Sequence, residues 1–210
     1  MTNRILSLAT LGCALLAGLV TAPAAAAGQD ASPQELRLVS SRISLSGTSN
    51  IHAYTASSTA ARLVRLQVSD GVAEEHAWDA LLAPGALQAL EISLPAATLS
   101  SPREGLDKNM HKALKVTEHR DITFRLSRLE TVGAGGAVRG IGVLTVAGVE
   151  RDVTLAIKTA RSDAGLTVTG EVQLLMTDFG IAPPKAMLGM LKTDPRITVT
   201  FEALFAIPRT

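Results

Sequence analysis

The chain has 210 residues, which is long enough for one domain with a substantial core, and 47% of them are hydrophobic. Its formal net charge is +1, with 20 Lys and Arg against 19 Asp and Glu. This balance gives no sign of a protein that binds nucleic acid or a strongly acidic surface.

The first 27 residues are expected to be a secretory signal peptide. Arg4 provides the positive n-region, residues 5–20 are apolar, and Ala25-Ala26-Ala27 offers the small residues of a cleavage site. The mature protein would then be a single β-barrel domain of residues 28–210 with no stable membrane anchor. The alternative is that the segment stays attached as an N-terminal anchor.

Cleavage would also remove Cys13, the only cysteine, together with one basic charge. A net charge near zero would remain, and disulfides, thiol catalysis and zinc–thiolate sites would be excluded. The sequence therefore predicts a bacterial periplasmic or secreted protein.

Six stretches of the chain alternate apolar and polar residues with a period of two, as half-buried strands do. The first four strands are expected at residues 36–46, 51–58, 61–69 and 87–95. Because successive side chains point to opposite faces, each strand has one apolar face to bury. So many strands in one domain indicate a barrel or a sandwich around a shared interior.

One amphipathic helix is expected to interrupt the strands. Ser101 is suited to cap it, Pro102 fits the first helical position, and Glu104 completes a capping box. The apolar stripe of this helix consists of Leu106, Met110, Ala113 and Leu114. A short helix of this kind covers an open barrel end or packs on a wall.

Five more strands are expected at residues 121–130, 137–147, 151–160, 166–177 and 196–207. The links between the strands before residue 177 are short, so those strands should be antiparallel neighbours. The residues that share the inward parity of the late strands and are candidates for ligand contact are Gly140, Gly142, Leu144, Gly170, Val172, Leu174 and Phe201.

The three glycines in this set permit two interpretations. Small inward residues leave volume unfilled, and a barrel of about eight strands is just wide enough to be packed solid or to hold one small ligand. The glycines could equally relieve strain where barrel strands bend. The two interpretations are compatible.

The segment before the last strand, residues 178–195, is unusually apolar for a loop, and Pro183-Pro184 prevents one continuous helix there. Its side chains and those of the helix are candidates to close or line the mouth of the barrel, and methionine adapts to irregular ligands. The mouth candidates are Met110, Leu114, Phe179, Ile181, Met187 and Met190. The alternative is that they plug the barrel end.

His52 is the one candidate for a polar role, either as a base or as a contact for a ligand head group. It could instead be held by neighbouring hydroxyls at the barrel rim. His111 and His119 lie eight residues apart, a spacing that matches no metal-ligand pattern. The chain also lacks a G-x-S-x-G nucleophile elbow, so no catalytic residue, metal or cofactor is expected.

Five segments, in this order, resemble one known family: Gly47-Thr48-Ser49-Asn50-Ile51-His52-Ala53-Tyr54, Leu106 to Lys115, Asp121-Ile122-Thr123-Phe124, Gly142 to Val149, and Met176 to Pro184. The chain is similar here to the YceI-like family of secreted lipid-binding barrels, over about residues 36 to 207. Arg120 departs from that family, which often has proline just before this strand.

This resemblance implies an all-β, antiparallel, lipocalin-like β-barrel of about eight strands with one short helix and an apolar late insertion. It also implies a long apolar ligand, such as a polyisoprenoid or another lipid, and no catalytic apparatus. Two other functions remain open: an enzyme that acts on a hydrophobic substrate with His52 as base, and a structural or interaction module with a solid core.

Overall fold

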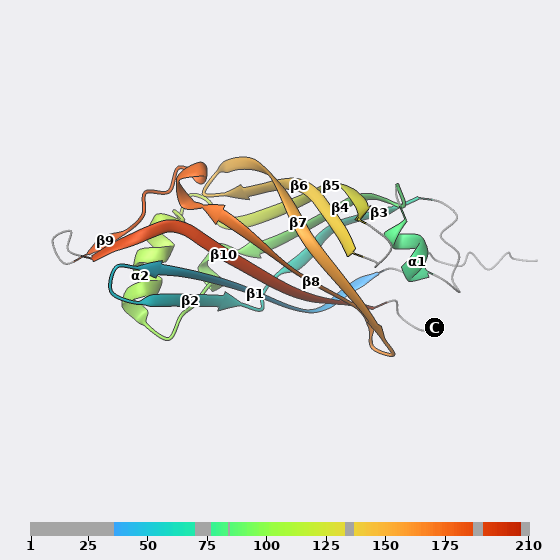
Figure 1. Ribbon diagram of the computed structural model, residues 1–210, viewed down its shortest axis with the longest axis horizontal. Coiled ribbons are helices and arrows are strands. Elements are labelled where there is room, and N and C mark those ends of the chain that lie inside the picture. The colour runs from blue at the N-terminus through green and yellow to red at the C-terminus, as the bar shows by residue number, and fades with distance from the viewer. Residues whose placement is uncertain (1–35, 70–76, 84, 133–136, 187–190, 207–210) are drawn as a thin grey trace, which may run out of the picture. The chain divides into compact units, whose positions relative to one another are not determined.

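The computed structural model describes residues 36–69, 77–83, 85–132, 137–186 and 191–206 (Figure 1). The expected signal peptide lies outside these residues, so its boundary stays a prediction. Met187 and Met190 also lie outside them.

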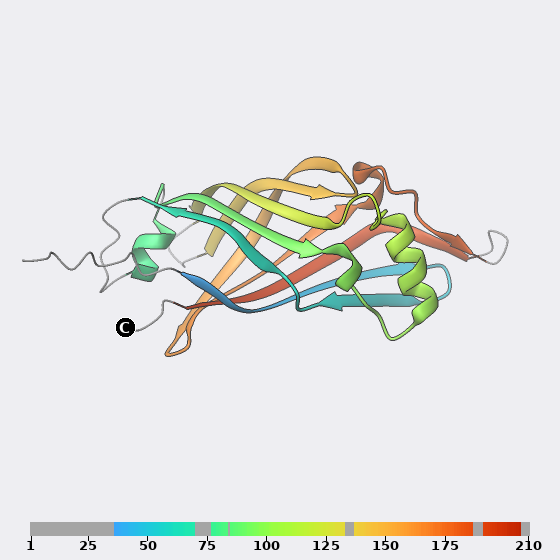
Figure 2. The same ribbon diagram turned by 180° about the vertical axis from the view of Figure 1, so that it is seen from behind.

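A single antiparallel sheet forms most of the molecule. Its strands are β1 (Arg37–Ser49), β2 (Ala53–Ser58), β3 (Arg62–Val68), β4 (Leu87–Pro95), β5 (Asp121–Val132), β6 (Ala137–Val146), β7 (Val149–Ser162), β8 (Gly165–Leu175), β9 (Lys185–Ala186) and β10 (Leu191–Ala206). They follow the order β2-β1-β10-β8-β7-β6-β5-β4-β3, with β9 paired to β10. The sheet curls around an interior (Figures 1 and 2), which confirms the expected antiparallel, lipocalin-like fold.

Within the described residues, two α-helices accompany the sheet, α1 (Ala77–Leu82) and α2 (Glu104–Ala113), with short 3-10 turns η2 (Ala96–Thr98) and η3 (Met176–Phe179). α2 is the expected helix. α1 was not expected from the sequence.

The expected capping box of α2 is wrong. Arg103, which has extended backbone angles (φ −129°, ψ 107°), is the N-cap, and it makes no side-chain cap bond. The Ser101 hydroxyl accepts a hydrogen bond from the Arg103 amide (3.1 Å), and the Ser101 amide donates to Asp107 Oδ1 (2.8 Å). Asp107 thus takes the part expected of Glu104, because the helix begins at Glu104, two residues later than Pro102.

The last strand begins at Leu191 instead of residue 196, so the late insertion is shorter than expected. Asn50 holds this early start: its amide donates to the Lys192 carbonyl (3.1 Å), and its Oδ1 accepts from the Lys192 amide (2.8 Å). The register between β1 and β10 shifts opposite Pro195, and this irregularity accommodates a proline within a strand.

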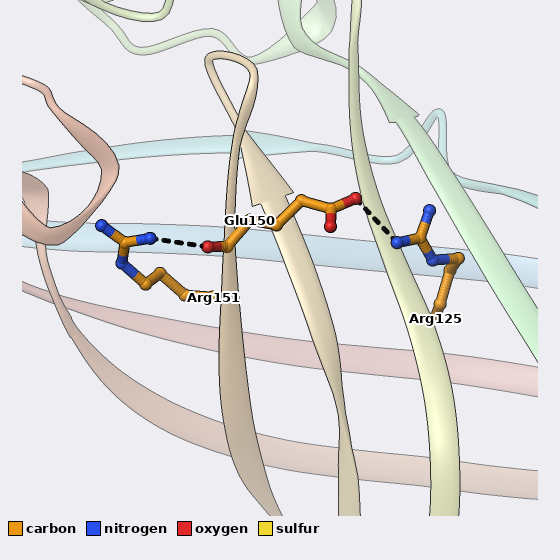
Figure 3. A network of polar contacts seen from close by, with 3 residues as sticks. All are labelled: Arg125, Glu150 and Arg151. Carbon is orange, nitrogen blue, oxygen red and sulfur yellow. Dashed lines mark hydrogen bonds and ion pairs between the residues drawn. The ribbon is translucent and has the colours of Figure 1, made fainter.

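The outer face of the sheet is polar and carries exposed ion pairs. Arg125 on β5 donates to Glu150 on β7 across the intervening β6 (2.7 Å), while Arg151 donates to the Glu150 carbonyl (2.8 Å; Figure 3). Arg139 and Arg128 both bind Glu130. Such exposed pairs contribute about 0–1 kcal/mol each to the free energy of unfolding. They therefore add little to the stability of the fold, and their main effect is to make this face hydrophilic.

The inner face is apolar, and a cluster of buried side chains lies beneath the C-terminal end of α2. The buried cluster there consists of Val146, Ala147, Met176, Phe179 and Ile181, with Ala113, Leu114 and Ile122 against it. Among the described residues, no large side chain is less than 2% exposed. No helix in the described part of the chain is both long and apolar enough to cross a bilayer.

Candidate functional site

A cavity of about 520 Å³ lies inside the curled sheet. All nine strands of the main path contribute side chains to it, mostly Leu, Ile, Val and Phe. The period-two pattern explains this lining, since each strand turns one apolar row inward. The volume lies within the range of about 300–1,000 Å³ that is typical of small-molecule sites.

Helices stand at both ends of this cavity (Figure 1). Met110 and Leu114 of α2 line one end, and Trp78 and Leu81 of α1 line the other. The cavity therefore extends along the length of the barrel. An extended chain fits such a space better than a compact molecule does.

Most of the residues expected at the site lie around this cavity. Those that line it are His52, Met110, Leu114, Leu144, Val172, Leu174, Phe179, Ile181 and Phe201. Phe179 and Ile181 are also buried in the cluster below α2.

The three inward glycines do not line the cavity, because larger side chains lie over them. The Phe201 ring covers Gly170, its direct partner across β8 and β10. The Phe124 ring lies over Gly142, and Ile157 Cδ1 lies over Gly140; each is 2.7 Å from where a Cβ would sit. The glycines thus leave room for larger side chains from neighbouring strands, which lie over them and line the cavity in their place. Aromatic residues often cover glycines across a sheet in this way.

Polar side chains gather at the α2 end of the cavity. They are Ser49, His52, Tyr54, Arg103, Asn109 and Thr193. Burial, and then the negative charge of Asp194, raise the pKa of Tyr54 above its ordinary value of 10.0. Tyr54 is therefore a neutral hydrogen-bonding group at physiological pH, beside a mouth that also carries the cationic Arg103.

His52 is exposed at this mouth, and its backbone is held by Ser49. The Ser49 hydroxyl donates to the His52 carbonyl (2.8 Å) and accepts from the His52 amide (3.1 Å). Among the described residues, the His52 ring has no hydrogen-bonded partner that could orient it as a base. Likewise, the described residues contain no group of three or more His, Cys, Asp or Glu placed to hold a metal ion.

Sequence reasoning missed the cavity wall supplied by α1. Trp78, Leu81 and Leu82 recur at the i, i+3 and i+4 positions of a helix, which was the available signal. The pattern covers barely one turn and a half, too little to stand out from the surrounding residues. Tyr54 and Arg103 were missed because nothing in their local spacing brings them together.

Solved structures share this fold at low sequence identity. BcnA from Burkholderia cenocepacia matches with a TM-score of 0.61 at 12% identity, over 79% of this chain and 96% of BcnA. A polyisoprenoid-binding domain from Saccharophagus degradans, implicated in plant cell wall breakdown, matches with a TM-score of 0.56 at 12% identity, over 82% of this chain and 98% of that domain. The YceI protein of Campylobacter jejuni matches with a TM-score of 0.51 at 17% identity, over 71% and 82%.

Among curated proteins, no sequence matches this chain. The sequence model of the YceI-like domain, in contrast, matches residues 40–205, which span nearly the whole described sheet. The five resembling segments lie within or at the edge of the strands and helix that build the cavity. The chain belongs to the family of YceI-like domains.

Proposed function

We propose that this protein is a non-catalytic binding protein that holds a long apolar ligand, a polyisoprenoid or another lipid, inside its barrel. The observation that carries this proposal is the apolar cavity that extends from α2 to α1. The polyisoprenoid-binding domain of S. degradans has the same fold, which supports the ligand class.

The energetics favour a carrier that exchanges its ligand. Burying one methylene group from water contributes about 0.8 kcal/mol, so a chain of about forty carbons would exceed the ceiling of roughly 20 kcal/mol for non-covalent binding. Such a ligand normally resides in a bilayer, however, and its transfer to an apolar cavity gains little hydrophobic free energy. Selectivity must then come from the shape of the cavity and from its mouth.

The polar mouth beside α2 suits the head group of such a ligand. Arg103 supplies a cation, Asn109 supplies an amide, and Tyr54 supplies a neutral hydroxyl. The opposite end, beneath Trp78 and Leu81, is apolar and suits the end of a hydrocarbon chain. We therefore propose that the ligand lies with its head group at α2.

The proposed location is the bacterial periplasm or the cell exterior. The support is the N-terminal sequence pattern, with Arg4, an apolar stretch and Ala25-Ala26-Ala27. A binding protein in that location would carry lipids between or near membranes without spanning one itself.

Native mass spectrometry of the protein purified from its own host tests the binding proposal. We expect a reproducible mass increment that organic solvent removes. Val168 lines the cavity, so Val168→Trp should abolish the increment by filling the space. The neighbouring Thr167, which is not a lining residue, provides the matched control Thr167→Trp, which should retain it. Absence of an increment from the unaltered protein would favour the solid-core module.

His52→Ala distinguishes binding from catalysis. Because the His52 ring lies at the mouth with no orienting partner among the described residues, we expect the variant to lose little or no ligand retention. The extracted ligand should also be chemically the same from both proteins. Unchanged retention together with a loss of ligand conversion would support the enzyme instead.

A further inference from the structure

The sheet leaves one place where two strand edges face each other without pairing. β2 pairs with β1 only from Ile43 to Thr48, so the first half of β1 has β10 on one side and the beginning of β3 on the other. Figure 2 shows β3 and the start of β1 diverging toward α1. A second cleft occupies this place, lined by residues 36–38 and 61–66. We call residues 36–39 and 61–66 the β1–β3 seam.

The seam lies beside the central cavity. Four residues, Leu36, Leu38, Ala61 and Leu66, line both the cleft and the cavity. The cleft and the cavity thus share part of their lining. Whatever surface covers the seam therefore lies next to residues that also line the cavity.

Two valines stand exposed at the rim of the seam. Val39 is 58% exposed and Val64 is 59% exposed. Each is the extra residue at a register shift, Val39 between Leu38 and Ser40 on β1 and Val64 between Leu63 and Arg65 on β3. A bulge redirects a side chain from the regular alternation, and here both bulges turn an apolar side chain to the outside.

Three arginines, Arg37, Arg62 and Arg65, line the same cleft, and all are exposed. Within the described residues none of them makes an ion pair. The acid nearest in register is Glu91, opposite Arg65, and Arg65 instead donates to Gln67 (2.9 Å). On β5 and β6, in contrast, Arg125, Arg128 and Arg139 each bind a glutamate.

We propose that the β1–β3 seam is a docking surface for a bilayer that contains anionic phospholipids. The three arginines bind lipid phosphates, while Val39 and Val64 enter the interfacial layer between them. Unpaired cations beside exposed apolar side chains suit a membrane surface, which offers negative charge and hydrocarbon together. This proposal goes beyond ligand storage, and its test needs no ligand.

Vesicle flotation tests the charge requirement. The unaltered protein should float with phosphatidylcholine vesicles that contain phosphatidylglycerol, much less with phosphatidylcholine alone, and binding should fall as salt rises. Each arginine near an anionic surface contributes about 5-fold in binding, so the triple variant Arg37→Gln, Arg62→Gln, Arg65→Gln should bind roughly 100-fold more weakly. The matched control, Arg125→Gln, Arg139→Gln, Lys158→Gln, removes the same charge from the outer face of β5 to β7 and should bind nearly as the unaltered protein does.

The valines provide an independent arm of the same experiment. Val39→Ser with Val64→Ser should weaken binding at every salt concentration, whereas Val132→Ser, at an exposed valine away from the seam, should not. Thermal unfolding checks that every variant is folded.

Three results would overturn the proposal. The first is equal binding to neutral and anionic vesicles. The second is equal loss of binding in the seam and control triple variants. The third is a protein that does not bind vesicles and forms a dimer that the seam variants dissociate, because the seam would then be an interface between two copies of the chain.

Discussion

At the scale of single residues, Tyr54 is the most informative group of the cavity mouth. It is the only tyrosine in the chain, so tyrosinate absorbance reports on it alone. Burial and Asp194 favour its neutral form and raise its pKa. We expect the native protein to titrate above 10.0, the unfolded protein near 10.0, and Asp194→Asn between the two.

This shift also predicts a change of stability with pH. Because the folded protein holds the Tyr54 proton more tightly, the unfolded chain releases it first as the pH rises. The contribution of this proton to the free energy of unfolding is fully present below the ordinary pKa of tyrosine. It is lost as the pH rises through the pKa that Tyr54 has in the folded protein. Tyr54→Phe should remove this alkaline loss from the free energy of unfolding. An unchanged alkaline slope in Tyr54→Phe would contradict the assignment.

At the scale of elements, Gly170 makes room for the Phe201 ring between β8 and β10. A Cβ on Gly170 would meet the Phe201 ring and lie 2.6 Å from the Ala156 carbonyl oxygen, a backbone atom with little freedom to move. Gly170→Ala should therefore lower the free energy of unfolding by about 1–3 kcal/mol. Urea unfolding measures this change.

Gly105 in α2 provides the matched control for that substitution. No atom lies within 4 Å of where its Cβ would be, and glycine is a weak helix former. Gly105→Ala should thus raise the free energy of unfolding by about 0.5–1 kcal/mol. Similar losses in both variants would mean that the ring over Gly170 does not matter.

Helix α2 shows why boundaries are harder to predict than elements. Its apolar stripe was visible in the sequence, and the helix forms where that stripe lies. Its start was misplaced because Ser101 bonds to Arg103 and Asp107 instead of capping the first turn. Several side chains in this segment can cap, and the path of the chain after Pro102 selects among them.

At the scale of the whole molecule, the expected strands all form, most within two or three residues of their expected ends. Period-two alternation is a local property, and neighbours such as β6, β7 and β8 are joined by turns too short for any other pairing. The pairing of β1 with β10 is different, because it joins residues at opposite ends of the sheet's sequence. No local pattern specifies that pairing.

The candidate site divides in the same way. Inward parity alone identified Leu144, Val172 and Leu174 as candidates, and all three line the cavity. The alternation pattern could not indicate whether Gly142 and Gly170 leave empty volume in the cavity or are covered by an aromatic ring from a neighbouring strand. That outcome depends on the rotamers of Phe124 and Phe201 on neighbouring strands.

The amino-acid sequence by itself determined the strands, their apolar faces and the family, because alternation and short motifs are encoded within about ten residues. Only the tertiary structure decided that these faces surround a cavity, that Tyr54 and Arg103 line the same cavity, and that arginines gather at the β1–β3 seam. Those features arise where distant segments meet, and the volume between them is set by how the whole sheet closes.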